Sequence, residues 1–337
     1  MGVIMFNKIY EKVLKFIKEN YKTILIFLVL YIVLTIRLPY YIYIGGGIIN
    51  LEKRIELTSE ESGSYNLAYV KQLYATIPTY LLSFLIDSWT LESISNYTTS
   101  DESLEEIDSR NKLYLEEANS HAIINAYKLA GKEINIKKNQ YKVIQIDKNS
   151  DTDIKVGDTL ISVNGISVNN NSEYKEYLKN LSLNSKLNVK VIRDNKEIDC
   201  YAKLINLNGE KIIGLYLVNI YDFETNPPIE LNFKWNESGP SGGFMLSLAI
   251  YDRLVPEDLT KGKKIVGTGT IDANGNVGEI GGVNYKLMGA VKNKADLFFV
   301  PSNNYEEAIK TKNKYNYDIK IIAVDTLQEA IDYLENN

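Results

Sequence analysis

Cysteine and histidine are almost missing from this sequence of 337 residues, which has one of each, Cys200 and His121. One cysteine excludes an internal disulfide framework and a cysteine-rich zinc site. Cys200 lies in the alternating segment KEIDCYAKLI, so we interpret it as a buried structural thiol. A Ser-His-Asp triad would have to use His121, which lies in a helical pattern with no nucleophile motif near it in the sequence. The sequence therefore disfavours a histidine-based catalytic site.

Dense positive charge is missing as well. The formal net charge is -5, and no single element is rich in lysine and arginine, which argues against a nucleic-acid partner. The phosphate-loop pattern Gly-x-x-x-x-Gly-Lys-Ser/Thr does not occur, so the sequence predicts no nucleotide-binding module. We expect no cofactor and no metal. A chain of this length suggests about two domains.

One apolar run lies near the N-terminus, at residues 23–36. As a helix it would reach only ~21 Å against a hydrocarbon core of ~30 Å, so we expect a transmembrane helix over residues 16–38 with its flanking charges directed outward. A cleaved signal peptide is the alternative, but the segment LPYYIYIGGG after the run offers no convincing small-x-small cleavage site. The positive-inside rule then predicts a cytoplasmic N-terminus over residues 1–22, a single-pass anchor in the cell membrane and an extracytoplasmic catalytic region. This prediction depends on the lysines before the run, Lys8, Lys12, Lys15, Lys18 and Lys22.

The region from residue 39 to residue 135 mixes strand and helix patterns. It has a glycine-rich bend near its start, and its last helix should close at Gly131. The expected elements are strands at 39–51 and 64–73 and helices at 78–91 and 104–129.

Residues 137–205 resemble a PDZ domain. The segment KVGDTLISVNG at 155–165 includes an Asn-Gly turn, a short helix is expected at 173–181, and a hairpin is expected at 186–205. The resemblance implies that an extended peptide, often a C-terminus, binds as an added strand beside the helix. The segment expected to hold the carboxylate, KKNQY at 137–141, lacks the usual glycine. A small β-rich domain of another function is the alternative.

Ser241 lies in the segment ESGPSGGFMLSLAIYD, between a strand expected at 227–235 and an apolar, buried helix expected at 242–254. The N–H groups and the dipole at the start of such a helix favour negative charge, as an oxyanion requires. The alternative is an ordinary N-cap serine.

Lys286 lies in a helix expected at 283–294, on the same face as Val283 and Ala290. Lysine is rarely buried, so its place on an apolar face is unusual. The alternative is a lysine that extends from the helix edge into solvent.

These segments together resemble the proteolytic domain of Lon-family serine peptidases. The shared pattern consists of GPSGG at 239–243, GTGTI at 267–271 and GNVGEIGGVNYK at 275–286. The resemblance implies that Ser241 is the nucleophile, Lys286 the general base and Thr268 a partner of the lysine. It also makes the backbone around Ser241 a candidate oxyanion hole, with the candidate residues Gly239, Pro240 and Gly242.

This sequence departs from the Lon pattern at two places. Many Lon sequences have an acid directly before Gly-Pro-Ser, where this chain has Ser238, with Glu237 one residue earlier. The usual proline before Ile-Gly-Gly is Glu279 here. Either change could alter substrate access or the charge state of the lysine.

The order of anchor, PDZ domain and Lon-like domain resembles that of bacterial membrane-anchored PDZ-Lon peptidases. The resemblance implies an α+β fold in which residues 206–337 form the proteolytic domain, and residues 39–135 could be its first half, with the PDZ domain inserted. It also implies an ATP-independent Ser-Lys endopeptidase that acts on a peptide or protein substrate. The sequence leaves a homo-oligomer open. The rival function is a PDZ adaptor with a degenerate Lon-like domain.

Overall fold

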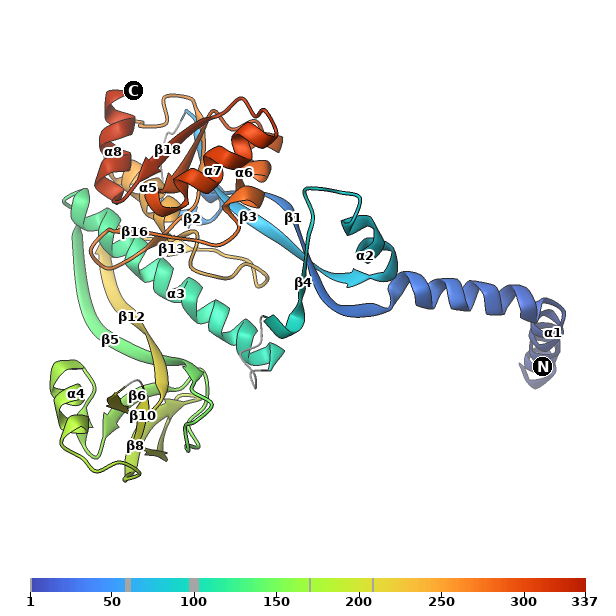
Figure 1. Ribbon diagram of the computed structural model, residues 1–337, viewed down its shortest axis with the longest axis horizontal. Helices are drawn as coiled ribbons and strands as arrows, with labels where there is room; N and C mark the ends of the chain where they lie inside the picture. Colours follow the sequence, from blue (N-terminus) through green and yellow to red (C-terminus); the bar gives the residue numbers. More distant parts are fainter. Residues whose placement is uncertain (1, 58–61, 97–102, 170, 208) are drawn as a thin grey trace. The chain divides into compact units, whose positions relative to one another are not determined.

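The computed structural model describes residues 2–57, 62–96, 103–169, 171–207 and 209–337 (Figure 1). The chain divides into two compact units, which are described separately. The smaller unit consists of Met1–Ile44 and Lys71–Tyr97, and the larger of Gly45–Val70 and Thr98–Asn337. The division crosses two strands, β1 (Arg37–Asn50) and β3 (Ser64–Thr76).

The smaller unit begins with a long helix, α1 (Gly2–Thr35), and continues into the first part of β1. Strand β4 (Thr90–Ser93) pairs antiparallel with β1, with Tyr40 opposite Ser93. Its other elements are the end of β3, α2 (Ile77–Ser83) and the short helix η2 (Ile94–Asn96).

The predicted transmembrane helix over residues 16–38 is not supported. No helix in the described ranges combines the length and the apolar character needed to cross a membrane. Helix α1 ends at Thr35, because the chain is already extended from Arg37, and charged Lys18 and Lys22 lie near the middle of the helix. The predicted extension of the helix to residue 38 is wrong, because residues 37 and 38 belong to strand β1.

The helix predicted at 78–91 is also too long. Helix α2 ends at Ser83, a turn follows, and Thr90–Ser93 pairs with β1 instead. The strand predicted at 227–235 is reduced to β13 (Glu230–Leu231), which pairs with β2 (Ile55–Glu56). In both segments tertiary pairing decided what local propensity could not.

The core of the larger unit is built on a sheet whose strand order is β18-β17-β14-β3-β1-β4. Strand β14 (Lys264–Gly267) runs parallel to β3 and to β17 (Leu297–Pro301), and β17 runs parallel to β18 (Lys320–Val324). Such strands have apolar residues on both faces because helices cover both.

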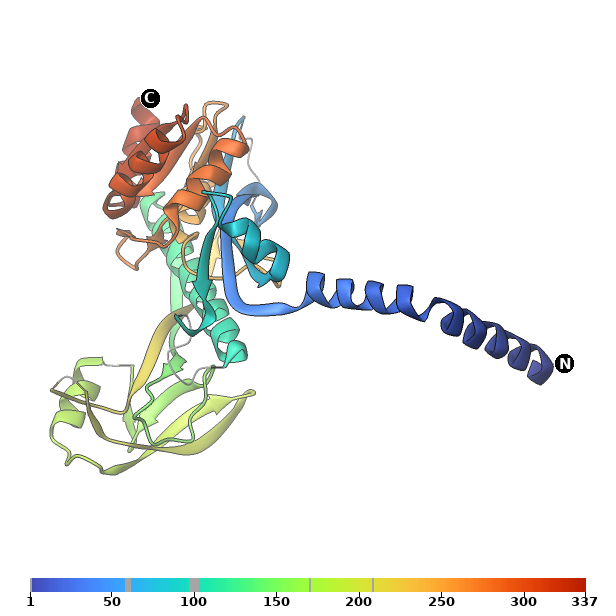
Figure 2. The same ribbon diagram turned by 45° about the vertical axis from the view of Figure 1, so that its right-hand side comes forward.

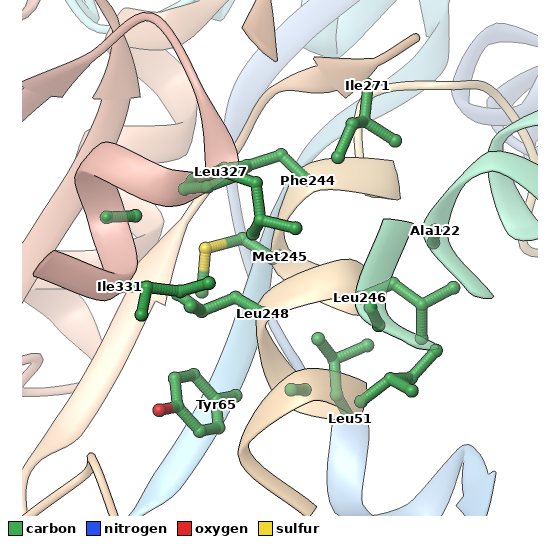
Figure 3. Close-up of a cluster of buried hydrophobic side chains, with 14 of the residues drawn as sticks. Leu51, Tyr65, Ala122, Phe244, Met245, Leu246, Leu248, Ile271, Leu327 and Ile331 are labelled. Carbon is green, nitrogen blue, oxygen red and sulfur yellow. The ribbon is translucent and has the colours of Figure 1, made fainter. Parts of the chain in front are cut away.

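Helices cover the two faces of this sheet. On β17, Phe299 packs with α5 (Gly243–Leu254), α8 (Leu327–Asn336) and α3 (Leu104–Leu129), in the cluster shown in Figure 3. The neighbouring Phe298 points to the other face, where α6 (Val283–Lys292) and α7 (Ser302–Lys314) lie. Small elements complete this region: η1 (Leu51–Lys53), β15 (Thr270–Ile271) and β16 (Val277–Gly278).

The cluster on the α5 face combines segments that are far apart in the sequence. Leu51 and Tyr65 come from the first strands, Ala122 from α3, and Phe244 and Ile331 from the C-terminal third of the chain (Figure 3). The region that resembles a PDZ domain lies between Ala122 and Phe244 in the sequence.

That region has its own antiparallel sheet, in the order β12-β5-β6-β8-β9, and its own apolar core. Strands β5 (Glu133–Ile146) and β12 (Leu215–Asn226) lie side by side over most of their length (Figures 1 and 2). The chain therefore enters and leaves the region along one strand pair. The remaining elements are β6 (Thr159–Val163), β7 (Ile166–Ser167), α4 (Asn171–Lys179), β8 (Lys186–Arg193), β9 (Lys196–Lys203), β10 (Ile205–Leu207) and β11 (Glu210–Ile212).

Several local predictions are confirmed. The Asn-Gly turn forms with φ 48° at Asn164 and 82° at Gly165, and Asp194 and Asn195 close the predicted hairpin with positive φ. The helices predicted at 104–129, 173–181, 242–254 and 283–294 all form, with ends shifted by at most two residues. Cys200 is buried and free of any disulfide.

Candidate active site

Ser241 lies in the turn that precedes α5. Gly239 has φ 92°, a conformation that favours glycine, and its N–H donates to the backbone oxygen of Asn111 on α3 at 2.9 Å. The N-cap of α5 is Gly242, and the helix begins at Gly243. The N-cap interpretation of Ser241 is therefore wrong, because the serine lies one residue too early to cap this helix.

Two hydrogen bonds hold the backbone of Ser241. Its carbonyl oxygen accepts the N–H of Gly269 at 2.9 Å and the hydroxyl of Thr268 at 3.0 Å. Thr268 is fully buried, directly after β14. The turn at the serine is thus joined to the end of the central strand.

Lys286 reaches the same threonine from α6. Its Nζ donates to Oγ1 of Thr268 at 3.1 Å, and its side chain is 4% exposed. Val283, Leu287 and Ala290 are buried on the same helix, as the spacing predicted. The alternative of a lysine that extends into solvent is wrong.

Burial changes the chemistry of Lys286. Desolvation disfavours the ammonium form and lowers the pKa of Lys286 from 10.5 to about 8. No carboxylate in the described part of the chain forms an ion pair with it. A large part of the side-chain population is therefore the neutral amine near pH 8, and a neutral amine can accept a proton.

The three residues Ser241, Thr268 and Lys286 are therefore brought together, in a chain from Nζ through Oγ1 to the serine carbonyl. Within the described residues, the recorded hydrogen bonds do not join Nζ of Lys286 to Oγ of Ser241. The lysine is linked to the serine by two hydrogen bonds, from its Nζ to Thr268 and from Thr268 to the serine carbonyl oxygen.

Ser241 also lines a cavity of about 660 Å³. Its lining mixes apolar side chains such as Ile48 and Phe233 with charged ones such as Lys53, and α3 contributes Leu115 and Asn119. The volume lies in the range of pockets that hold small ligands or short peptide segments.

Glu237, one residue earlier than the acid expected directly before Gly-Pro-Ser, forms an ion pair with Arg54. Its two carboxylate oxygens accept from Nε and Nη2 of Arg54 at 2.9 and 2.6 Å, and both side chains are 12% exposed. Burial would raise the pKa of Glu237, but hydrogen bonds from Arg54 and the N–H of Lys234 outweigh it, so that the pKa is lowered. The carboxylate of Glu237 therefore holds the segment before Ser241 against Arg54.

The other predicted residues lie outside this network. Ser238 is exposed and lines the 660 Å³ cavity, and Glu279 is exposed before α6. His121 is buried on α3, where its Nδ1 is 3.1 Å from the backbone oxygen of Ile271. His121 is buried among its neighbours, and within the described ranges it forms no hydrogen bond to Ser241.

The candidate oxyanion-hole residues differ in whether they have a free backbone N–H to donate. The N–H of Gly239 already donates to Asn111, and Pro240 has no N–H. Gly242 remains, together with the N–H of Ser241 itself, at the positive end of the α5 dipole.

Across the residues that the structure describes, no group of three or more His, Cys, Asp and Glu side chains could hold a metal ion.

A second candidate site lies between α4 and the strand β12. Here a cavity of about 530 Å³ is lined by Tyr174 and Leu178 of α4 and by residues 209–217. Three lysines at this cavity, against one glutamate, favour a negatively charged ligand. They are Lys175, Lys179 and Lys211.

The prediction that residues 137–141 form the carboxylate-binding segment of the PDZ-type region is wrong. These residues lie inside β5 and pair with β12, so they form no loop. The loop that faces α4 contains Gly214, with φ 67°, directly before β12. Gly214 precedes the alternating run LYLVNIYDF, at the far end of the region from the segment 137–141.

Sequence reasoning missed Arg54, Asn111 and the loop at Gly214. Arg54 and Glu237 are 183 residues apart, and Asn111 contacts Gly239 through its backbone. Neither contact leaves a local pattern that the sequence could reveal.

Comparisons with known proteins agree with this division. Residues 235–335 match the family described as the Lon protease (S16) C-terminal proteolytic domain, and residues 130–204 match the PDZ domain family. The chain is thus a mixed α+β protein with a Lon-type proteolytic region and a PDZ-type region.

Curated relatives share only part of the chain. A Lon protease of Campylobacter jejuni is 29% identical over 43% of this chain and 17% of its own length. A Lon protease of Mesomycoplasma hyopneumoniae is 33% identical over 29% of this chain and 11% of its own length. The chain thus spans less than a fifth of the length of these relatives.

Among solved structures, the PDZ domain of the SdrC-like protein from Listeria monocytogenes is 18% identical. The match covers 25% of this chain and 93% of that domain, with a TM-score of 0.22. We base no conclusion on so low a score.

Proposed function

We propose that this chain is a serine endopeptidase in which Ser241 is the nucleophile and Lys286 the general base. One observation carries the proposal: a lysine that is 4% exposed, with a pKa lowered to about 8, is linked through Thr268 to the backbone of the serine. A buried lysine whose pKa is lowered toward the working pH is the kind of group that can serve as a catalytic base.

In the proposed reaction, neutral Lys286 accepts the proton of Ser241 as Oγ attacks the carbonyl carbon of the scissile peptide bond. The N–H groups of Ser241 and Gly242 stabilise the oxyanion. The lysine then gives its proton to the departing amine, which leaves an acyl ester on Ser241. Water, deprotonated by Lys286, hydrolyses the ester and restores the free hydroxyl. Thr268 holds Nζ in position throughout.

Reactions of this kind need no nucleotide. We propose ATP-independent cleavage, since no phosphate-loop pattern occurs in these 337 residues. We also propose that the PDZ-type region is an insertion, because the cluster around Phe244 includes Leu51 and Ala122 from before it.

The PDZ-type region captures substrate in the proposed function. A C-terminal tail adds to β12 as a strand, with its carboxylate beside Gly214 and the lysines of the 530 Å³ cavity. The chemistry of that cavity favours apolar tail residues, because Leu178, Leu215 and Leu217 line it.

We also propose that the protein is attached to the cell membrane through its N-terminal segment, with the catalytic region outside. The support is in the sequence: an uncharged run at 23–36 follows five lysines. Protease added to intact cells should remove a C-terminal tag. Protection of the tag until lysis would contradict this placement.

The test of the peptidase uses the full chain and Ser241→Ala. A pool of unstructured peptides should be cleaved by the parent chain and left intact by the variant, while circular dichroism and thermal melting are unchanged, because only a hydroxyl is removed. Cleavage by both chains would refute the dyad. A parent chain that binds tailed peptides but cleaves none would favour the PDZ adaptor.

A further inference from the structure

The peptide-binding edge of β12 is short. Strand β12 is the outer strand of its sheet, so one side of its backbone faces away from β5. Val143, opposite Leu217, uses its N–H and its carbonyl oxygen for Asp158 and Gly157, on the β6 side. Leu217 therefore directs its own N–H and C=O outward, and by the period of two so does Leu215. These two residues can pair with an added strand.

The next outward position is already occupied. By the same period Asn219 directs its N–H outward, and Oε1 of Glu117 accepts that N–H at 2.9 Å. Glu117 lies on α3, which belongs to the catalytic side of the unit. An added strand that reached Asn219 would have to displace this carboxylate.

Open space continues from this point toward the serine. A cavity of about 170 Å³ is lined by Glu117, Tyr174 and Asn219, and shares Tyr174 and Leu217 with the 530 Å³ cavity. Glu117 also lines a cavity of about 460 Å³ that reaches Pro240, the residue before the nucleophile. The three cavities thus follow one another from Gly214 to the serine turn.

We propose that Glu117 ends the peptide-binding edge of β12 at Asn219 and directs the upstream part of a bound polypeptide off the sheet, along Pro240, toward Ser241. A tail bound with its carboxylate at Gly214 runs antiparallel to β12, so its N-terminal direction leads to Asn219. The pairing edge then holds about four residues, or roughly 14 Å of extended chain. Glu117 is a positioning residue, and this role deepens the proposed function.

The same helix connects this stop to the catalytic cavity. Tyr114, Ala118 and His121 lie with Glu117 along the face of α3 that lines the 460 Å³ cavity, and this cavity reaches Pro240 beside the nucleophile. Leu115 and Asn119 line the 660 Å³ cavity with Ser241 from the opposite face of the same helix. A polypeptide that leaves the sheet at Glu117 therefore follows the Glu117 face of α3 to Pro240. The substrate class implied is a protein with a free, flexible C-terminal tail.

The first experiment measures binding alone. Full-length Ser241→Ala is titrated with labelled peptides of about four, six and eight residues that end in the same apolar tail and a free carboxylate. With Glu117 intact, affinity should stop rising at about four residues. With Glu117→Ala added, the eight-residue peptide should bind about 3–10-fold more tightly than the four-residue peptide, because further backbone pairs form. With Glu117→Gln the plateau should return, because the amide oxygen can accept the same N–H.

Glu116→Ala is the matched control, since Glu116 is exposed and pairs with Lys142. It should keep the plateau. Affinity that rises with length in the parent, or an unchanged plateau in Glu117→Ala, would overturn the proposal. So would a parent that binds none of the peptides.

The second experiment maps cleavage by mass spectrometry. In the parent chain the cut should lie at a constant distance from the C-terminus of a tailed substrate, and in Glu117→Ala the cuts should spread over several bonds. Equal patterns would overturn the role of Glu117. Because the binding arm uses the inactive serine variant, its outcome is independent of whether the peptidase proposal holds.

Discussion

Asp158 in the PDZ-type region and Lys286 in the catalytic region are both buried charged side chains, and their surroundings differ. Asp158 in the PDZ-type region is 2% exposed and accepts from Nε and Nη2 of Arg193 at 2.8 and 2.6 Å. Lys286 in the catalytic region is 4% exposed and has the neutral hydroxyl of Thr268 as its hydrogen-bond acceptor. A buried charge with an opposite partner keeps its charge and serves structure, whereas one without a partner readily loses its proton and becomes reactive.

The largest expected effect comes from removing the unpaired charge. Lys286→Met should lower kcat/KM by at least about 10³-fold, because no base remains to take the serine proton. Lys286→Arg should be equally inactive, since a guanidinium keeps its proton. Peptide cleavage by each variant is measured against Ser241→Ala as the background. Binding of tailed peptides should be unchanged, and activity near the parent level in either variant would remove Lys286 from the mechanism.

Activity should depend on pH through the same lysine. The neutral base becomes more abundant as pH rises toward the pKa of about 8, so kcat/KM should rise about tenfold per pH unit well below it and level off above it, about 50-fold between pH 6 and pH 8. In His121→Gln the same rise of kcat/KM with pH should be seen. If the rise disappears when His121 is replaced, the histidine is the base instead.

Stability should respond in opposite directions in the two regions. Lys286→Met should stabilise the protein by about 1–3 kcal/mol at pH 7, because burying a lysine with a pKa near 8 costs up to about 3 kcal/mol. Arg193→Met should destabilise it by about 2–4 kcal/mol, because Asp158 is left buried without its cation. Denaturant unfolding measures both. Lys190→Met, on the same strand as Arg193, is the control: it removes an exposed ion pair with Glu197 of β9 and should change stability little.

The gain in Lys286→Met should itself depend on pH. Between pH 8 and 10.5 the unfolded chain binds more protons at this lysine than the folded chain does, so the stability of the parent rises with pH. The cost of burial is therefore full below pH 8 and gone near pH 10.5. The advantage of the methionine variant should shrink across that window, and a constant advantage would show that its cause is packing.

The smallest effect is expected in the peptide groove. Gly214→Val should lower kcat/KM on a tailed substrate about tenfold and leave a short, tail-free peptide unaffected, because a Cβ at φ 67° would meet Oγ of Ser150 at 1.9 Å. Gly165→Ala is the control, with φ 82° and open space around its Cβ. Equal losses on both substrates would mean that the groove supports the catalytic region structurally.

Much of the candidate site could be predicted from local sequence, because its residue types are unusual for their positions in the pattern. A lysine on the face of Val283 and Ala290 is anomalous wherever that helix packs, and GPSGG before an apolar helix is a recognisable turn. The helices 104–129 and 242–254 were predicted for the same reason, since long periodic runs depend little on context.

The failures have a common cause in long-range pairing. Residues 137–141 became part of β5 because β12, about 80 residues later, pairs with them. Thr90 and Leu91, at the end of the helix predicted over 78–91, lie in a strand because they pair with β1. Backbone pairing depends on which strand lies alongside, and no local pattern records that.

The sequence by itself determined which chemistry this protein can carry out: one histidine, one cysteine, a serine in a glycine turn and a lysine on an apolar face leave few mechanisms open. The tertiary structure alone decided that no carboxylate among the described residues pairs with the lysine, that Arg54 pairs with Glu237, and that Glu117 accepts the N–H of Asn219. Residue types set which protons and charges exist. Their pKa values and their partners depend on burial and on contacts between segments distant in the chain, which only the folded structure brings together.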